Sequence, residues 1–257
     1  MKQVLATVIS NRNVMPETHL IWLDSPQIAA EAKAGQFVMV RCGEDTLLCR
    51  PFSVHQTEGA KMALLFAIVG RGSYWLSQCQ IGDKINIFGP LGNGFSIFPA
   101  SKNLLMVAGG IGIAPLGFLT QQALRQAYSV KVLLGASTAS QLYRQCLSPS
   151  EVELIIATED ASAGKEGLVT DLLPEYVDWA DQVFVCGPMS MYRDMVLKKR
   201  ELKVEGKSVQ ISLEVRMGCG RGLCYGCTIK TKNGLKRVCE DGPVFNLHDI
   251  LWDELSY

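Results

Sequence analysis

The feature that most constrains the fold is a change in the pattern of apolar residues at Pro99-Ala100-Ser101. Before this point, short β-type runs such as QVLATVIS and QFVMVRC are separated by Gly, Pro, Asn and Asp, which predicts a small barrel or sandwich. After it, apolar runs such as NLLMVAGG and DQVFVCGP alternate with helix-compatible stretches, which predicts a doubly wound parallel sheet. The alternation of apolar runs and helix-compatible stretches stops at about residue 211. We therefore predict a β-domain at 1–99, an α/β domain at 100–210 and a small domain at 211–257.

The composition excludes several function classes. Lys plus Arg and Asp plus Glu balance at 25 each in 257 residues, so the basic patch of a nucleic-acid-binding protein is not expected. The uncharged run from Leu104 to Leu119 is shorter than the roughly 20 residues of a membrane span. The first residues also lack the pattern of a signal peptide. We expect a cytoplasmic protein with no membrane or nucleic-acid partner, in which cysteines stay reduced.

Four cysteines near the end have the spacing C-x4-C-x2-C-x11-C, at Cys219, Cys224, Cys227 and Cys239. This order of ligands is that of plant-type [2Fe–2S] ferredoxins. A structural zinc site is an alternative, although its ligands usually come as two short-spaced pairs, and ordinary buried thiols are another. The neighbouring glycines, at 218, 220, 222 and 226, allow positive φ angles and let N–H groups point at cluster sulfurs. The pattern favours an iron–sulfur cluster.

In the first domain, Arg50-Pro51-Phe52-Ser53 combines three groups that suit a flavin. An arginine can bind a diphosphate, an aromatic ring can stack on a flavin or ribose, and a hydroxyl can meet a ring nitrogen. A plain surface loop is the alternative for so short a motif. Gly70-Arg71-Gly72-Ser73, which resembles a backbone anion cradle, adds support. Together they predict a flavin site.

In the second domain, the first strand runs into a glycine turn from Gly109 to Pro115. A strand, a glycine turn and a helix N-terminus form a phosphate site, although a tight turn without ligand is the alternative. Pro115, at the start of the predicted helix, replaces the third glycine of a Rossmann fingerprint. No acidic residue follows VKVLLGAS, so the choice between NAD and NADP stays open. A later strand brings Cys186 to the carboxyl edge of the sheet, where ligands bind.

The segments RPFS, GRGS, GPLGNGF, GGIGIAPL and CGPMSMYRDM, in this order, resemble the ferredoxin–NADP reductase superfamily. That resemblance implies a Greek-key FAD-binding barrel followed by a NAD(P)-binding α/β domain. The short tail, the x11 spacing and the stretch DGPVF at 241–245 resemble a narrower family, the iron–sulfur/FAD electron-transfer subunits of bacterial two-subunit, NAD-linked dihydroorotate dehydrogenases.

The resemblance also implies site residues. For the four cysteines it implies iron ligation, and for Cys186 a catalytic place near the nicotinamide, with a buried structural thiol as the alternative. For FAD it implies binding by Arg50, Pro51, Phe52, Ser53, Phe66, Ala67, Ile68, Gly72 and Ser73. For NAD, a substrate, it implies binding by Gly109, Gly110, Gly112, Pro115, Gly187 and Pro188. Phe52 stands where the superfamily usually has Tyr, which keeps stacking but loses a phenolic hydrogen bond.

The function implied is electron transfer from a dihydroorotate-oxidising, FMN-containing catalytic subunit through [2Fe–2S] and FAD to NAD+, in pyrimidine (UMP) biosynthesis. The chain is then the NAD-reducing subunit of an enzyme, and the assembly is a heterotetramer of two of each subunit. Alternatives are the small subunit of a ferredoxin-dependent NADP oxidoreductase or of a sulfide dehydrogenase, a stand-alone NADH-dependent iron–sulfur flavoprotein reductase, and a zinc-binding scaffold. The three histidines are isolated and expected to be structural, with His55 alone close enough to Ser53 to lie near the flavin.

Overall fold

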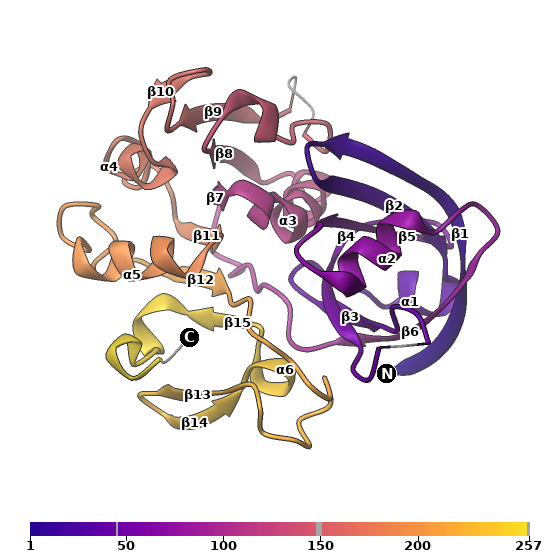
Figure 1. Ribbon diagram of the computed structural model, residues 1–257. Coiled ribbons are helices and arrows are strands. Elements are labelled where there is room, and N and C mark those ends of the chain that lie inside the picture. The colour runs from indigo at the N-terminus through magenta and orange to yellow at the C-terminus, as the bar shows by residue number, and fades with distance from the viewer. Residues whose placement is uncertain (45, 148–150, 256–257) are drawn as a thin grey trace.

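The computed structural model describes residues 1–44, 46–147 and 151–255. Three parts follow one another along the chain (Figure 1): a barrel, an α/β sheet, and a small C-terminal part that lies against both. Among the described residues, no helix is both long and apolar enough to cross a lipid bilayer.

The N-terminal part is a closed antiparallel barrel with the strand order β1-β2-β5-β4-β3-β6. Strands β3, β4 and β5 are consecutive neighbours and β2 returns beside β5, which is the Greek-key arrangement predicted from the resemblance. The strands are β1 (Lys2–Met15), β2 (Thr18–Asp24), β3 (Phe37–Val40), β4 (Arg50–Glu58), β5 (Lys61–Ala67) and β6 (Lys84–Leu91), with helices α1 (Pro26–Ala29) and α2 (Arg71–Gln78) between them.

The second part is a sheet with the order β10-β9-β8-β7-β11-β12-β15, parallel except at β15. Strand and helix alternate as the apolar pattern predicts. The strands are β7 (Asn103–Gly109), β8 (Ser129–Ala136), β9 (Glu153–Thr158), β10 (Lys165–Glu166), β11 (Gln182–Cys186) and β12 (Val209–Ser212). The helices are η1 (Gly110–Gly112), α3 (Ile113–Arg125), η2 (Ala139–Gln141), η3 (Val169–Leu172), α4 (Leu173–Tyr176) and α5 (Met189–Leu197).

The C-terminal part consists of a separate β-hairpin and one further strand that joins the α/β sheet. The hairpin is β13 (Thr228–Thr231) with β14 (Gly234–Arg237), and α6 (Val238–Asp241) follows it. Strand β15 (Val244–Asn246) then pairs antiparallel with β12 and extends the α/β sheet, before η4 (Leu247–Asp249) and η5 (Trp252–Glu254). The tail therefore shares a sheet with the preceding part, a pairing that the sequence analysis did not predict.

Two apolar cores join the parts. One runs from the barrel, with Ile21 and Leu64, into one face of the α/β sheet with Met106 and Phe118. The other begins at the opposite face of the sheet and continues to the buried thiols of Cys227 and Cys239 in the tail. Because burial of apolar area is the main stabilising term, the parts are held as one body and their sites keep fixed positions relative to one another.

Candidate functional site

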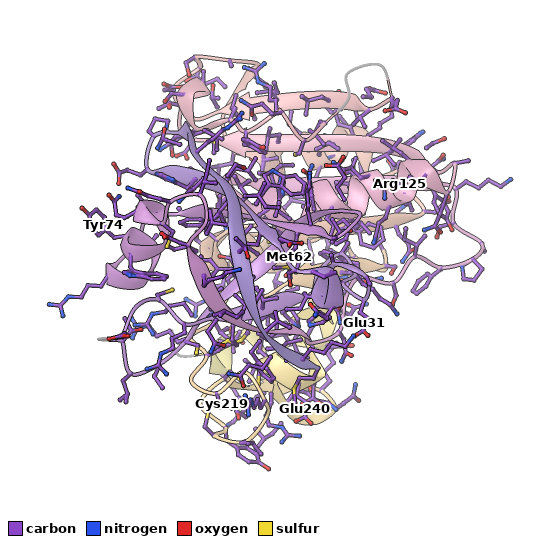
Figure 2. The ribbon with its side chains drawn as sticks, turned by 90° about the vertical axis from the view of Figure 1, so that its right-hand side faces the viewer. Glu31, Met62, Tyr74, Arg125, Cys219 and Glu240 are labelled. Atoms are coloured by element: carbon purple, nitrogen blue, oxygen red, sulfur yellow. The ribbon has the colours of Figure 1, made fainter. Side chains whose placement is uncertain are left out.

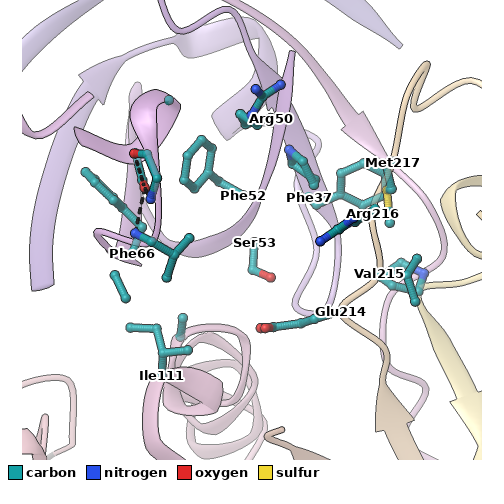
Figure 3. A pocket seen from close by; sticks show the side chains of 18 of the residues that line it. Phe37, Arg50, Phe52, Ser53, Phe66, Ile111, Glu214, Val215, Arg216 and Met217 are labelled. Atoms are coloured by element: carbon teal, nitrogen blue, oxygen red, sulfur yellow. Dashed lines mark hydrogen bonds between the residues drawn. The ribbon is translucent and has the colours of Figure 1, made fainter. Parts of the chain in front are cut away.

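A cavity of about 760 Å³ lies where the three parts meet (Figure 3). Strands β4 and β5 and the start of α2 form its barrel wall, and Ile111 and Ala114 close it from the α/β side. The segment 212–217, which leads from β12 to the cysteine loop, forms a third wall together with Pro243. Its volume is in the range of pockets that hold cofactor-sized molecules.

The predicted RPFS motif lies along this cavity. Arg50 begins β4 and its Nη1 donates to the Leu48 carbonyl at 2.7 Å. Phe52 meets Phe66 edge to face, with ring centroids 5.4 Å apart, so the two rings form an apolar wall. Arg50, Pro51, Phe52, Ser53, Phe66 and Ala67 all line the cavity, as do Gly72 and Ser73, whereas Ile68 does not.

The GRGS segment is the first turn of α2, with Gly70 as its N-cap residue. Ser73 Oγ accepts hydrogen bonds from the Val69 and Gly70 N–H groups at 2.9 and 3.2 Å, which shapes the turn. A Cβ at Gly72 would lie 2.9 Å from Arg50 Cγ, so any side chain there would displace the arginine. Free N–H groups of a helix start beside a guanidinium suit a diphosphate. These residues therefore fit FAD.

The predicted dinucleotide turn connects β7 to α3 through η1. A Cβ at Gly112 would lie 2.0 Å from the Cys186 carbonyl oxygen, so only glycine lets the turn approach the end of β11. A Cβ at Gly109 would lie 3.1 Å from Pro188 Cδ and 3.5 Å from Gly187 Cα, so this glycine lies beside the same segment. Two predicted NAD segments, the turn from Gly109 to Pro115 and the pair Gly187-Pro188, thus converge at the carboxyl edge of the sheet, the usual place for a ligand.

Pro115 is the third residue of α3, whereas the sequence suggested the first position. The turn tightens into η1 before α3, which shifts the α-helical start to Ile113. The missing N–H of proline is harmless there, because the first four N–H groups of a helix have no intrahelical partner.

Cys186, the candidate catalytic thiol, is fully buried at the end of β11. Its Sγ lies 3.9 Å from the Ser212 carbonyl oxygen, and burial raises its pKa well above the ordinary value. It is absent from the lining of the cavity. A neutral buried thiol of this kind can pack under a nicotinamide but supplies no thiolate, and its catalytic role stays a prediction.

Glu214 is the site residue that the sequence analysis missed. It lies just past β12 and points into the cavity toward the side on which Ser53 lies (Figure 3). Its side chain is exposed to the cavity, and partial desolvation by the surrounding walls raises its pKa above the ordinary value. An acid directly after a strand of a parallel sheet is the signal that could have identified it.

The cysteine loop surrounds its thiols with backbone donors. Cys219 Sγ accepts N–H groups from Arg221, Leu223 and Cys224 at 3.3, 3.3 and 3.4 Å. Burial acts against ionisation, but these bonds outweigh it and lower the pKa of Cys219 to about 6. Donors aimed at sulfur are what a bound cluster requires, and they hold at least one ligand ready as thiolate.

The thiols form two pairs. Cys224 hydrogen-bonds Cys219, while Cys239 donates its N–H to Cys227 Sγ at 3.5 Å and itself accepts the Gly222 N–H at 3.2 Å. Burial, together with the adjacent Cys227 thiol, raises the pKa of Cys239 to about 12. In the described part of the chain, no group of three His, Cys, Asp or Glu side chains is arranged to hold one metal ion. Two pairs fit the two irons of a [2Fe–2S] cluster better than one tetrahedral zinc.

The loop glycines play two different roles. Gly220 and Gly222 have φ angles of +65° and +72°, as expected for a backbone that wraps around a cluster. Gly218 and Gly226 do not; a Cβ there would lie 3.4 and 3.6 Å from Cys224 Sγ, so they leave room beside that thiol. Tyr225 takes the remaining left-handed position, at +57°.

The loop that carries Cys219 lies against the barrel (Figure 2). A Cβ at Gly220 would lie 2.6 Å from Met39 Cγ of β3, and the Arg221 guanidinium lies 4.0 Å from the Phe88 ring centroid of β6. Asn93 also donates to the Glu240 and Asp241 carbonyls at 3.1 Å. The thiols and the flavin-type cavity thus share β3 as a common support.

Comparison with known proteins agrees with this geometry. Residues 214–251 match the family model of the iron–sulfur cluster binding domain of dihydroorotate dehydrogenase B. The chain is 42% identical to the dihydroorotate dehydrogenase B (NAD+) electron transfer subunit of Desulforamulus reducens, over 96% of this chain and 98% of that one. The corresponding subunit of Caldanaerobacter subterraneus subsp. tengcongensis is 37% identical, with the same coverage.

Solved structures show the same fold. The NADH-dependent reduced ferredoxin–NADP oxidoreductase has a chain that superposes with a TM-score of 0.88 at 29% identity, covering 98% of this chain and 91% of that one. The ferredoxin reductase of carbazole 1,9a-dioxygenase superposes with a TM-score of 0.71 at 19% identity, covering 82% and 68%, a likeness that concerns the fold alone.

Proposed function

Because the chain belongs to the family of dihydroorotate dehydrogenase B (NAD+) electron-transfer subunits, we propose that it carries electrons from a dihydroorotate-oxidising subunit to NAD+ in pyrimidine biosynthesis. The observation that carries the proposal is the junction of a flavin-type cavity, a dinucleotide turn and a paired-thiol loop in one rigid body. When bound, FAD exchanges electrons singly or in pairs, the cluster singly and NAD as hydride.

The residues of the chain bind and orient these groups. Arg50 and the start of α2 hold the FAD diphosphate, and Phe52 with Phe66 supplies the apolar wall for its ring. Ser53 offers a hydroxyl and Glu214 an acid in the lining of the cavity. The Gly109–Gly112 turn binds the NAD phosphates, with Gly187 and Pro188 as its opposite side.

The four thiols bind iron, and the N–H groups around Cys219 and Cys239 stabilise the negative charge of the cluster. Cys224 is exposed at the surface, flanked by the exposed side chains of Leu223 and Tyr225. An accessible ligand between two exposed apolar side chains suits an approach by another protein. The partner in this proposal is the FMN-containing catalytic subunit, in an assembly of two of each subunit.

The ferredoxin–NADP oxidoreductase alternative is less favoured, because identity to that protein is 29% against 42% for the dihydroorotate dehydrogenase relative. Co-purification from the source cell tests the partner. Recovery of a flavoprotein that oxidises dihydroorotate and forms a heterotetramer with the chain is the expected result. Recovery of a ferredoxin-linked flavoprotein that does not oxidise dihydroorotate would contradict the proposal.

A further inference from the structure

His55 is a fully buried histidine at the boundary between the barrel and the α/β part. It lies on β4, two residues after Ser53, and its Nδ1 is 2.8 Å from the Ala114 carbonyl oxygen in the first turn of α3. A carbonyl oxygen only accepts, so Nδ1 carries the hydrogen and donates it. In the neutral ring the other nitrogen, Nε2, is then unprotonated.

The surroundings keep this ring neutral and in place. A Cβ at Gly117 of α3 would lie 3.2 Å from His55 Cε1 and 2.9 Å from Cys146 Sγ. The glycine therefore leaves room for the imidazole ring against the helix. The Tyr143 ring meets His55 edge to face at 5.6 Å. Nε2 has no hydrogen-bond partner in the part of the chain that the structure describes.

Stability alone does not account for a histidine here. A buried nitrogen without a partner costs on the order of 1–3 kcal/mol, whereas an apolar ring of similar size would fill the space without that cost. The feature that an apolar ring cannot supply is the hydrogen bond from His55 Nδ1 to the Ala114 carbonyl oxygen.

The bond joins the barrel wall of the cavity to its α3 wall. Phe52 and Ser53, just before His55 on β4, line the cavity from the barrel side, and Ala114 lines it from the α3 side. Helix α3 starts directly from the Gly109–Gly112 turn, the proposed phosphate site of NAD. A hydrogen-bond donor on β4, the strand that carries Phe52 and Ser53, thus binds α3, the helix that follows the dinucleotide turn.

We propose that His55 is a positioning residue for hydride transfer, which sets the spacing between flavin and nicotinamide through its bond to the Ala114 carbonyl. The inference rests on the proposed flavin–nicotinamide chemistry. In the reverse of the proposed direction, which the test below uses, the C–H bond of NADH breaks and the hydride, with its electron pair, joins the flavin, so NADH is oxidised and flavin reduced. A displacement of about 1 Å between reacting groups can cost about 100-fold in rate.

The test compares three substitutions in the FAD-loaded protein. His55→Phe keeps an aromatic ring but removes the donor, and His55→Asn places an amide N–H close to the position of Nδ1. His55→Gln carries the same amide one methylene further out. His248→Phe is the matched control, since it removes a histidine-to-carbonyl bond of 3.1 Å, to Val204, far along the chain from both walls.

In stopped-flow reduction by NADH, His55→Phe and His55→Gln should lower the limiting rate about tenfold or more. The long-wavelength charge-transfer band of the NADH–flavin pair should weaken with it. His55→Asn should recover most of the rate and the band, and His248→Phe should change neither. FAD content should stay at the wild-type level in all four. A merely structural role predicts instead that rates follow thermal stability, whichever histidine is replaced.

A second readout needs no cofactor. Amide hydrogen exchange of the first turn of α3 in the apoprotein should be faster in His55→Gln than in His55→Asn. Equal rates and equal exchange for Asn and Gln would overturn the inference, even if His55→Phe fails to fold. A wild-type protein that binds FAD but is not reduced by NADH would instead overturn the proposed function, so the two failures are distinguishable.

Discussion

The cysteine loop and the cofactor cavity each suit an anionic redox group, but they are built differently. The loop uses residues close together in the sequence, whereas the cavity uses residues far apart in it. The loop takes its ligands from residues 219–239 and surrounds them with its own N–H groups. The cavity takes its walls from β4, α2, α3 and the 212–217 segment, which lie far apart in the sequence. One site is therefore local and metal-dependent, whereas the other is assembled by the fold and exists before its ligand binds.

This difference determines what each site tolerates. Changes within the loop should remove the cluster and leave the cavity intact, because the core that joins the barrel to the α/β sheet contains none of the four cysteines. Changes in the cavity walls should alter FAD or NAD binding while the thiols stay paired. The segment 212–217 and Pro243 are the exception, since they join the two sites and line the cavity.

The largest effect is expected for Cys224→Ser. The replacement removes one of four iron ligands, so we expect loss of the cluster absorbance and iron, and at least a 100-fold decrease in dihydroorotate-dependent NAD+ reduction. NADH oxidation by a small dye should remain near the wild-type rate, because the cavity is separate. Cys79→Ala, in the barrel, is the control and should keep the iron. If dye reduction fell as much as NAD+ reduction with FAD retained, the separation of the two sites would be wrong.

Acid should weaken the junction between barrel and α/β part. Burial lowers the pKa of His55 to about 4, and its bond to Ala114 offsets this only in part. Burial also raises the pKa values of Tyr143 and Cys146, which face the ring, to about 12, so both stay neutral. The unfolded histidine binds a proton below about pH 6.5, so stability falls as pH drops from 6.5 toward 4, by at most about 3 kcal/mol.

Urea unfolding of wild type and His55→Asn across this pH range measures the effect. The stability difference between the two proteins should change in the Asn variant's favour as pH falls from 6.5 to 4. A difference that stays constant over the range would show that His55 titrates as it does in the unfolded chain.

Arg50→Ala should weaken FAD binding by about 10- to 100-fold, since a hydrogen bond to a charged group contributes about 1.5–3 kcal/mol. Fluorescence titration of the apoprotein with FAD measures the dissociation constant. The iron content should not change. Arg125→Ala, on the exposed end of α3, serves as the control and should bind FAD normally. Equal loss of iron and FAD in Arg50→Ala would mean that the two sites are not independent.

The smallest effect is expected for Glu214→Gln. The raised pKa of Glu214 means that its ionised form is disfavoured in the folded state, so stability is lost as pH rises above its ordinary pKa. The substitution should therefore raise the melting temperature slightly at pH 7 and have no effect near pH 4. Scanning calorimetry at the two pH values checks this. A lower melting temperature at pH 7 would indicate that the carboxylate is stabilised by a partner in the protein.

Features formed by residues close together in the sequence could be predicted from it, whereas features formed by residues far apart in the sequence could not. The cysteine spacing, the RPFS motif and the glycine turn are short, so their chemistry could be predicted and the resemblance placed them in one fold. The pairing of β15 with β12, and the role of 212–217 as a cavity wall, depend on where the chain returns in space. Glu214 and the His55–Ala114 bond were missed for the same reason, because each acts across elements that the sequence separates.

The central claim is that this chain links a dihydroorotate-oxidising subunit to NAD+. The most direct measurement is the rate of NADH formation from dihydroorotate and NAD+ by the purified partner subunit, with and without this chain. We predict NADH formation only when the chain is present, and its loss when Cys224→Ser replaces the wild type. NADH formation by the partner alone at the same rate, or none by the complex of fully loaded subunits, would contradict the claim.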